Sequence, residues 1–167
     1  MHSTIAVDVA ASPDLVFALA SDVTRWERLL PHYARSRARG RLPDGALLID
    51  FVARRPLIGL VGVGLPVAWR ARTWPEPDAR RLRFVHVAGA TRGMDVTWRI
   101  EPGPEGRGAH VAIDHDFAPA VPLFAAFVDR FFTRPIAGRT LATFRDIAEA
   151  VAATDESAMG STTNPSP

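Results

Sequence analysis

Two side chains of this 167-residue chain could carry acid–base chemistry, Tyr33 and His115. Tyr33 is the only tyrosine, and its phenol could polarise a carbonyl group or hydrogen-bond the polar end of a ligand. The alternative is a ring that only packs at the end of a helix. His115 shares one face of an alternating segment with Ile113 and Phe117. There it could exchange protons near neutral pH, or it could be a hydrogen-bonded structural histidine.

Tryptophans indicate a binding slot. Trp26, Trp69 and Trp98 would line a flat apolar cavity suited to a polycyclic or polyene ligand, although each one alone could equally be core. Strand alternation places Thr73 on the same face as Trp69. The predicted ligand-binding set is Trp26, Trp69, Thr73, Trp98, Phe117 and Phe131.

Composition excludes several chemistries. The chain has no cysteine and no lysine, because all 20 of its Lys+Arg residues are arginine. Thiolate nucleophiles, disulfides and lysine Schiff bases are therefore excluded. The five histidines lack metal-site spacing, and neither a nucleophile elbow nor a Walker-type phosphate loop is present, so we expect no metal and no cofactor.

Charge and hydropathy bound the partners and the location. The formal net charge is only +2. The sequence shows no concentrated basic face together with aromatic or helical elements that would read bases, so we expect no nucleic-acid role. The N-terminus shows no basic region followed by an apolar run, and no window reaches the roughly 18 apolar residues of a membrane span. We therefore expect a cytoplasmic protein.

Alternate arginines mark one predicted strand. Arg35, Arg37, Arg39 and Arg41 occupy every second position and are expected to point to one face. They could form a solvated outer face, or they could dock an acidic partner such as an acyl carrier protein that delivers a tethered chain.

Residues 56–69, PLIGLVGVGLPVAW, carry no charge and are rich in glycine and aliphatic side chains. We expect them to form a loop between two strands, where an apolar surface segment needs a reason. We favour a mobile lid over the cavity. A loop that makes peripheral membrane contact and a packed hairpin tip are the alternatives.

The elements that must position these residues follow from local signals. Ser12, Pro13 and Asp14 predict the start of a helix, whose apolar face recurs at spacings of three and four until Pro31 ends it. Alternating segments between turn signals predict seven strands, at residues 4–9, 33–42, 46–54, 66–74, 81–88, 94–101 and 108–117.

The helical period returns from residue 122 onward. It predicts a long C-terminal helix with a kink or break at Pro135. Residues 154–167 lack an apolar face and predict a disordered tail, which leaves one domain over residues 1–153. The expected class is α+β, with a seven-stranded antiparallel sheet curled around the long helix, an early helix closing one end, and an internal cavity between them.

The chain resembles the START-like (SRPBCC) superfamily, and within it the polyketide cyclase/dehydrase group that includes bacterial aromatase/cyclases and coenzyme-Q-binding proteins. The resemblance covers residues 3 to about 152. Its carriers are VDVAASPDLVFALASDVTRWERLLPHY, the Trp69 strand, VHVAGATRGMDVTW and AIDHDF. It implies the helix-grip fold. It also implies that Tyr33 matches a pocket tyrosine of the single-domain aromatase/cyclases, whereas Thr73 and Val87 stand where those enzymes carry pocket arginines.

Two functions follow as expectations. The first is an aromatase/cyclase-like enzyme that folds a polyketone or similar apolar chain and promotes aldol cyclisation and dehydration, with Tyr33 polarising the carbonyl group and His115 moving protons. The alternative is a non-catalytic carrier of a quinone, an isoprenoid or another lipid, which the loss of both family arginines favours. A ligand-sensing or stress-related domain is a third reading of the same fold.

Overall fold

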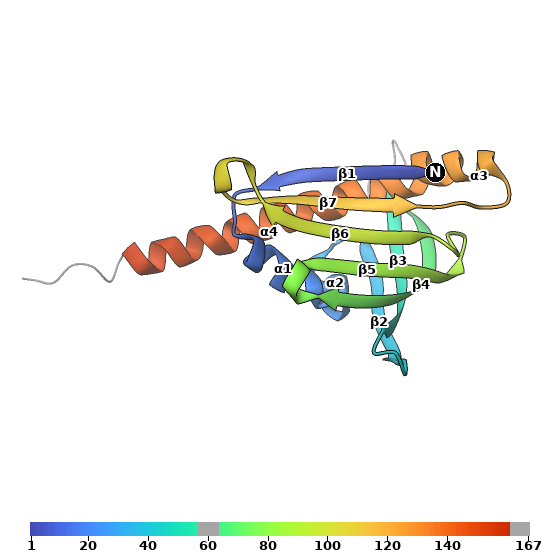
Figure 1. Cartoon of the computed structure of the whole chain (residues 1–167), viewed down its shortest axis with the longest axis horizontal. Coiled ribbons are helices and arrows are strands. Elements are labelled where there is room, and N and C mark those ends of the chain that lie inside the picture. The colour runs from blue at the N-terminus through green and yellow to red at the C-terminus, as the bar shows by residue number, and fades with distance from the viewer. Residues whose placement is uncertain (57–63, 161–167) are drawn as a thin grey trace, which may run out of the picture.

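The computed structural model describes residues 1–56 and 64–160 (Figure 1). The predicted antiparallel sheet is confirmed, with strand order β1-β7-β6-β5-β4-β3-β2. The strands are β1 His2–Val9, β2 Tyr33–Arg41, β3 Leu47–Pro56, β4 Gly64–Glu76, β5 Arg81–Gly89, β6 Asp95–Pro102 and β7 Ala109–Asp116. Each of the strands from β2 to β6 pairs with the next along the chain, and β1 pairs with β7, so β1 and β2 are the two edges.

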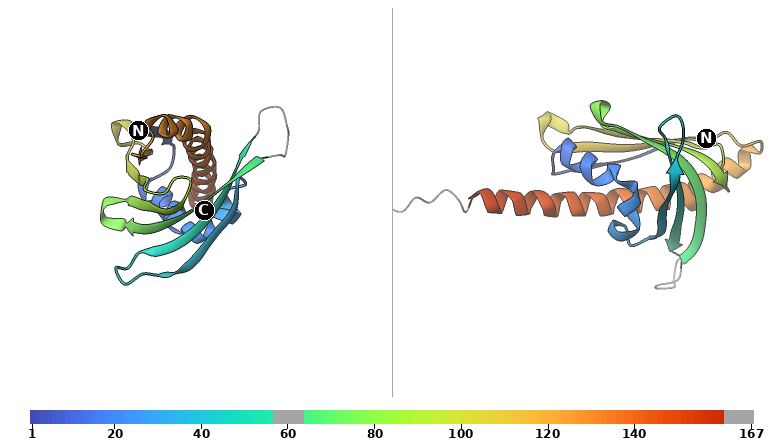
Figure 2. Two further views of the ribbon diagram at one scale, coloured as in Figure 1. Left: turned by 90° about the vertical axis from the view of Figure 1, so that its right-hand side faces the viewer. Right: turned by 90° about the horizontal axis from the view of Figure 1, so that it is seen from below.

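The helices are α1 Pro13–Ser21, α2 Trp26–Leu29, α3 Pro122–Val128 and α4 Arg134–Gly160, with short 3-10 turns η1 Val23–Arg25, η2 Pro77–Ala79 and η3 Pro104–Gly106 and the π-helical segment η4 Asp129–Thr133. The sheet curls around α4, while α1 and α2 lie toward one end of the molecule (Figure 2). This is the expected helix-grip arrangement. No described helix is both long and apolar enough to cross a membrane.

The first helix begins as predicted and then divides. The Ser12 hydroxyl accepts a hydrogen bond from the Leu15 amide at 3.2 Å. The predicted single run ends at Ser21, because Asp22 accepts from the Thr24 amide at 3.2 Å and starts a new turn. Trp26 and Leu30 are nevertheless buried, so the apolar face keeps its direction across the break.

The C-terminal helix is interrupted next to Pro135, as expected. Pro135 has no amide hydrogen and its ring crowds the carbonyl of residue 131, so the turn before it widens into η4. Beyond it, α4 runs to Gly160. Residues 154–160, predicted to belong to a disordered tail, are therefore helical, and residues 161–167 lie outside the described residues.

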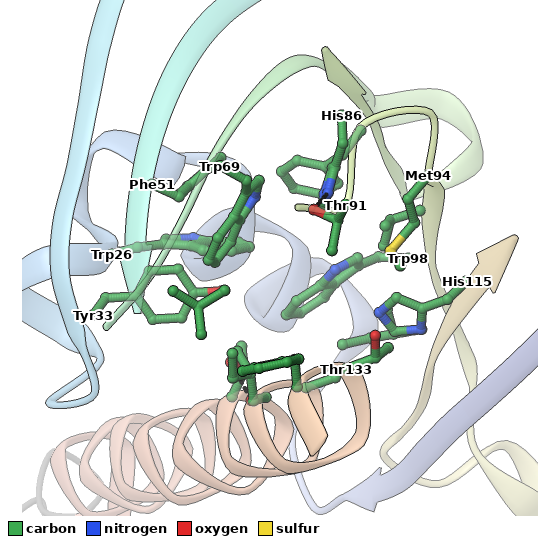
Figure 3. A pocket seen from close by; sticks show the side chains of 18 residues that line it. Trp26, Tyr33, Phe51, Trp69, His86, Thr91, Met94, Trp98, His115 and Thr133 are labelled. Carbon is green, nitrogen blue, oxygen red and sulfur yellow. Dashed lines mark hydrogen bonds between the residues drawn. The ribbon is translucent and has the colours of Figure 1, made fainter. Parts of the chain in front are cut away.

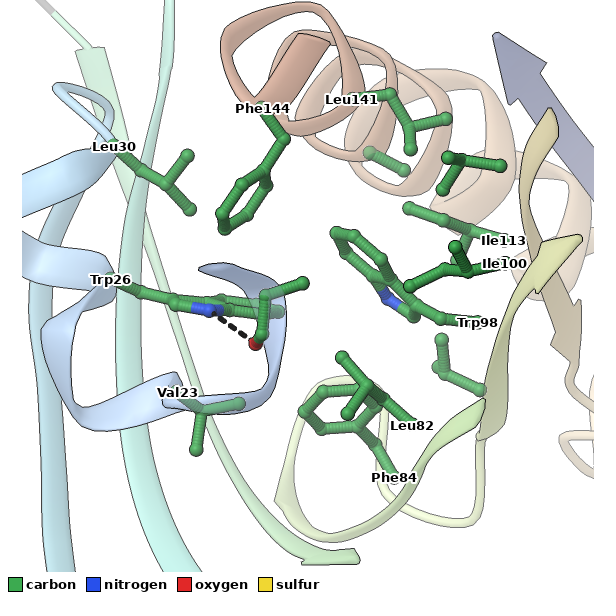
Figure 4. Close-up of a cluster of buried hydrophobic side chains, with 14 of the residues drawn as sticks. Val23, Trp26, Leu30, Leu82, Phe84, Trp98, Ile100, Ile113, Leu141 and Phe144 are labelled. Carbon is green, nitrogen blue, oxygen red and sulfur yellow. Dashed lines mark hydrogen bonds between the residues drawn. The ribbon is translucent and has the colours of Figure 1, made fainter. Parts of the chain in front are cut away.

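One cluster of buried apolar side chains packs between the sheet and the helices. Trp26 is 3% exposed and stands between α4 and the concave face of the sheet, with Leu30, Trp98 and Phe144 around it (Figure 4). An irregularity at Ala34 puts both Tyr33 and Ser36 on this concave face, although they are three residues apart. The Ser36 hydroxyl donates to the carbonyl of Val23, which ties β2 to the first helical segment.

Candidate functional site

A cavity lies between the concave face of the sheet and the helical segment η4–α4 (Figure 3). Its empty volume is about 610 Å³, a figure that includes solvent at the mouth. None of the described residues that line it carries a permanent charge. They are Trp26, Tyr33, Phe51, Val67, Trp69, Phe84, His86, Thr91, Met94, Val96, Trp98, Ile113, His115, Phe132, Thr133, Ile136, Ala137 and Thr140.

Aromatic rings build the sheet side of the wall. The Trp26 ring centre lies 5.5 Å from that of Tyr33 and 5.4 Å from that of Trp98. The Trp69 ring stacks on Phe51 at 5.3 Å and on His86 at 5.7 Å, both at an interplanar angle of 22°. A wall of ring faces that are already packed against one another suits a flat apolar ligand.

Gly89 lets β5 approach Trp69. Its φ is +97°, and a Cβ there would lie 2.5 Å from the Ala68 carbonyl oxygen and 3.0 Å from the Trp69 Cα. We expect Gly89→Ala to destabilise the protein by about 1–2 kcal/mol through the left-handed backbone and by about 1–3 kcal/mol more through the clash. Gly93→Ala is the matched control, because its φ is +88° but nothing lies within 4 Å. Equal losses in urea unfolding of the two variants would contradict the close approach.

At one end of the cavity, Tyr33 stands beside a buried hydrogen-bond chain. The Thr140 hydroxyl donates to the Ile136 carbonyl at 2.8 Å and therefore accepts from His32 Nε2, 2.9 Å away. His32 is thus the neutral Nε2–H tautomer, and burial lowers its pKa to about 4, with the charge of Arg139 adding to the effect. Burial raises the pKa of the Tyr33 phenol well above its usual value, and a side-chain hydrogen bond with Thr140 offsets only part of this rise. Tyr33 therefore keeps its proton at physiological pH.

Two histidines stand at the other end. Tyr33 and His115 appear on opposite sides of the cavity, with His86 and Thr91 on the His115 side (Figure 3). The Nδ1 atom of His86 lies 2.7 Å from the Thr91 hydroxyl oxygen. Burial, together with a smaller effect of the nearby His115, lowers the pKa of His86 to about 3. His86 is therefore neutral at pH 7.

His115 is buried and its Nδ1 atom makes no hydrogen bond within the described chain. Burial lowers its pKa to about 4, and this effect outweighs the opposing effects of the Ser3 backbone and the Asp129 carboxylate. A neutral imidazole with a free ring nitrogen can accept a hydrogen bond or a proton. This end of the cavity therefore offers a hydrogen-bond acceptor in an apolar wall.

The structure brings five predicted residues to the cavity, Tyr33, His115, Trp26, Trp69 and Trp98. It does not place the other three there. Thr73 shares the inner face with Trp69 and is buried, but the β4 part of the wall ends at Trp69. Phe117 lies past the end of β7 and packs against Phe124, and Phe131 is 36% exposed and packs against Phe127.

Some wall residues were missed from the sequence. His86 was detectable, because Leu82, Phe84 and His86 alternate on the buried face of β5. Thr133 and Thr140 were not, because their inward direction depends on the π-helical turn at η4. No three His, Cys, Asp or Glu side chains of residues 1–56 and 64–160 gather as a metal site would require.

The predicted arginine ridge is only partly correct. Arg35 and Arg37 are exposed opposite Val52 and Asp50, on the outer face. A register shift between Ala38 and Gly40 then reverses the alternation, so Arg41 pairs with Leu47 and donates to the Gly45 carbonyl at 2.8 Å. Arg39 binds Asp50 at 2.5 Å. Charged side chains on this edge strand also discourage pairing with another sheet.

The predicted loop at residues 56–69 is partly strand. Gly64 pairs with Pro56, and residues 64–69 form the start of β4. Residues 57–63, on which the lid prediction depends, lie outside the described residues. Leu65 is exposed, whereas Val67 faces the cavity.

Comparison with known proteins agrees with this geometry. Residues 9–144 match the family model described as polyketide cyclase / dehydrase and lipid transport. A search of curated proteins finds no match. The chain is similar in structure to the Zhui aromatase/cyclase from Streptomyces sp. R1128, with a TM-score of 0.71 and 18% identity over 89% of this chain and 93% of that chain.

Two further solved structures share the fold. The di-domain aromatase/cyclase StfQ of the steffimycin pathway has a TM-score of 0.71 and 17% identity, over 91% of this chain and 52% of that chain. A START superfamily protein from Mycobacterium smegmatis has a TM-score of 0.58 and 19% identity, over 92% and 97%. At these identities the structural similarity establishes the fold alone. Because the family model spans most of the sequence, the chain belongs to the polyketide cyclase/dehydrase and lipid transport family.

Proposed function

We propose that the protein binds an uncharged polyketone or similar apolar chain in this cavity and promotes its aldol cyclisation and dehydration. The observation that supports this most is the wall itself, which combines packed aromatic faces with hydrogen-bonding groups at two separate ends and has no permanent charge. A chain held against such a wall meets Tyr33 and His115 at different positions along its length. The wall would thus bring one enolisable carbon to one carbonyl group.

The two groups take complementary roles in this proposal. His115 accepts the proton from the carbon next to a carbonyl group, and the resulting enolate attacks the second carbonyl group. A pKa of about 4 makes the imidazole a weak base in the free protein, but the negative charge that develops on the enolate stabilises the imidazolium. Tyr33 gives its hydroxyl proton to the attacked carbonyl oxygen. The new hydroxyl group then leaves as water while the carbon beside it loses its second proton, and proton exchange with solvent returns the imidazolium and the phenolate to their neutral forms.

Delivery by an acidic acyl carrier protein is part of the proposal. Arg35 and Arg37 are exposed on the outer face of the edge strand, where an acidic partner could reach them. Arg39 contributes less, because Asp50 neutralises it. If a carrier protein delivers the chain, removal of Arg35 and Arg37 should lower product formation from a carrier-tethered chain in the assay below. The same removal should leave product formation from a free chain unchanged.

The test is cyclisation in a reconstituted pathway. We expect Tyr33→Phe and His115→Ala each to lower product formation by at least tenfold, because each removes a group that acts on the reacting atoms. His110→Ala is the matched control, since His110 lies on the same strand but points outward to Asp8 at 2.7 Å. The proposal fails if both cavity variants form product at the wild-type rate.

A second function has its own supporting observation. Thr73 and Val87 stand where the resemblance places cationic pocket groups, and no other cation lines the described wall. A cavity of this kind also suits a non-catalytic carrier of a quinone, an isoprenoid or another lipid. Native mass spectrometry of protein from its own source distinguishes the two. A released quinone, isoprenoid or lipid supports carriage, whereas a cyclised aromatic product or its polyketone precursor supports catalysis.

A further inference from the structure

Large apolar side chains are exposed along α3 and η4. Among the described residues, those with large exposed hydrophobic side chains are Leu65, Val121, Leu123, Phe124, Phe127 and Phe131. Five of these six lie between residues 121 and 131. Leu123 is 81% exposed and Phe127 is 47% exposed, so this is a continuous apolar surface rather than scattered single side chains.

This segment is apolar on two faces. Ala125 and Val128 are buried against the body of the protein and account for the inner face. On the outer face, the Phe127 ring is 47% exposed, and the rings beside it are those of its helical neighbours, Phe131 at 4.9 Å and Phe132 at 5.6 Å. Packing within the chain therefore explains the inner face but leaves the outer face to be explained.

After the exposed carboxylate of Asp116, the exposed charges along this part of the chain have one sign. No charged residue occurs from Phe117 to Val128. The next exposed charges are Arg130, Arg134 and Arg139, and the only acidic residue between Asp116 and Asp146 is Asp129. Asp129 is mostly buried and accepts from Arg134 Nε at 2.8 Å. An apolar face with an arginine flank complements a membrane surface that carries anionic headgroups.

The surface adjoins the cavity. Phe132, Thr133 and Ile136, which follow Phe131 directly, line the cavity wall. Helix α3 lies at the end of the molecule opposite to the projecting C-terminal end of α4 (Figure 1). A membrane on this side would meet the helical segment that also contributes Phe132 and Thr133 to the cavity wall.

We propose that the α3–η4 face, Val121 to Phe131 with its flanking arginines, docks on the surface of an anionic lipid bilayer. The apolar side chains enter the headgroup region and the arginines bind lipid phosphates. This proposal goes beyond the proposed function, because it rests on the outer surface and not on the chemistry in the cavity. It is also separate from residues 56–69, for which peripheral membrane contact was one alternative from the sequence.

The test is flotation of the purified full chain with phosphatidylcholine vesicles, with and without phosphatidylglycerol. We expect the wild-type chain to float with the phosphatidylglycerol vesicles, and added salt to weaken that binding. The double variant Leu123→Asp with Phe127→Asp should bind at least tenfold more weakly. Arg130→Glu should lower binding to the anionic vesicles several-fold. Circular dichroism shows whether each variant is folded.

Matched controls use the same changes elsewhere. Ala153→Asp alters an exposed position on the far part of α4, and Arg28→Glu reverses an exposed charge on α2. Both should bind like the wild type. Absence of wild-type binding, or unchanged binding of the double variant, overturns the proposal. So does a dimer that the double variant dissociates, because a second copy would then cover this face. Cyclisation of a free chain in solution tests the cavity separately, so the two proposals can fail independently.

Discussion

Replacing Trp26 with alanine is expected to lower the free energy of unfolding by about 3–5 kcal/mol. The indole is 3% exposed, and five aromatic rings pack around it. They are Tyr33 and Trp98, described above, Phe84 and Phe144, both at 5.7 Å, and Phe51 at 5.8 Å. Its Nε1 also donates to the Ala20 carbonyl at 3.0 Å, so truncation leaves that acceptor unpaired in a buried place. Urea unfolding followed by circular dichroism measures the loss.

Trp74 provides the matched control for this substitution. It lies on the outer face of β4, where its ring meets the guanidinium groups of Arg72 and Arg83 at 5.3 and 5.7 Å. We expect Trp74→Ala to cost about 1 kcal/mol or less, because such contacts at a partly exposed site are weak. If both tryptophan variants lost the same stability, Trp26 would not be the centre of the core.

Local signals predicted the frame of the fold because they act within a few residues. Ser12 caps a helix through its own neighbour, and strand alternation follows from backbone geometry alone. The same alternation correctly placed Trp69 and His115 on inner faces. It could not tell how far along a strand the cavity extends, and Thr73 was therefore assigned to a wall that ends before it.

Irregular backbone limited the remaining predictions. A single extra residue in β2 turned Arg41 away from the ridge that strict alternation predicts. The π-helical turn before Pro135 likewise decides that Thr133 faces the cavity while Phe131 faces outward. Phe131 and Thr133 lie in one apolar helical pattern, and only the packing of α3 against the body of the protein separates the inner face from the outer one.

Long-range partners were also beyond the sequence. His32 meets Thr140 across 108 positions of the chain, and that contact fixes the tautomer of the imidazole. The carboxylate of Asp129, in η4, acts on the pKa of His115, in β7, although the two residues are far apart in the sequence. The residue types at the candidate site were thus predictable, but their protonation was not.

Acid is expected to unfold the protein between about pH 6.5 and pH 4, because three buried histidines must gain protons on unfolding. Burial holds the pKa values of His32, His86 and His115 at about 4, about 3 and about 4. In the unfolded chain a histidine has a pKa of about 6.5. Above that pH all three are neutral in both states, and their contribution to stability is fully present. As the pH falls below about 6.5, the histidines bind protons in the unfolded state but not in the folded state, so the free energy of unfolding decreases.

The size of this effect is large compared with the stability of a domain. Each pKa unit corresponds to about 1.4 kcal/mol, so each histidine can lower the free energy of unfolding by up to about 3 kcal/mol by pH 4. Three such losses approach the whole stability of a typical domain, about 5–15 kcal/mol. The lowered pKa values of Asp50 and Asp114, held down by Arg70 and Arg99, act at lower pH, because unfolded aspartates start to bind protons only near pH 4.

Proton uptake gives the sharpest measurement, because the slope of the unfolding free energy against pH counts the protons gained. We expect that slope to approach three protons near pH 5 for the wild type and to fall by one in His115→Asn. The comparison depends on the slope and not on the absolute stability, so it holds even if asparagine packs poorly at position 115. A wild-type slope near zero between pH 6.5 and pH 4 would mean that the three imidazoles accept protons in the folded protein, and the neutral cavity on which the proposed chemistry depends would not exist.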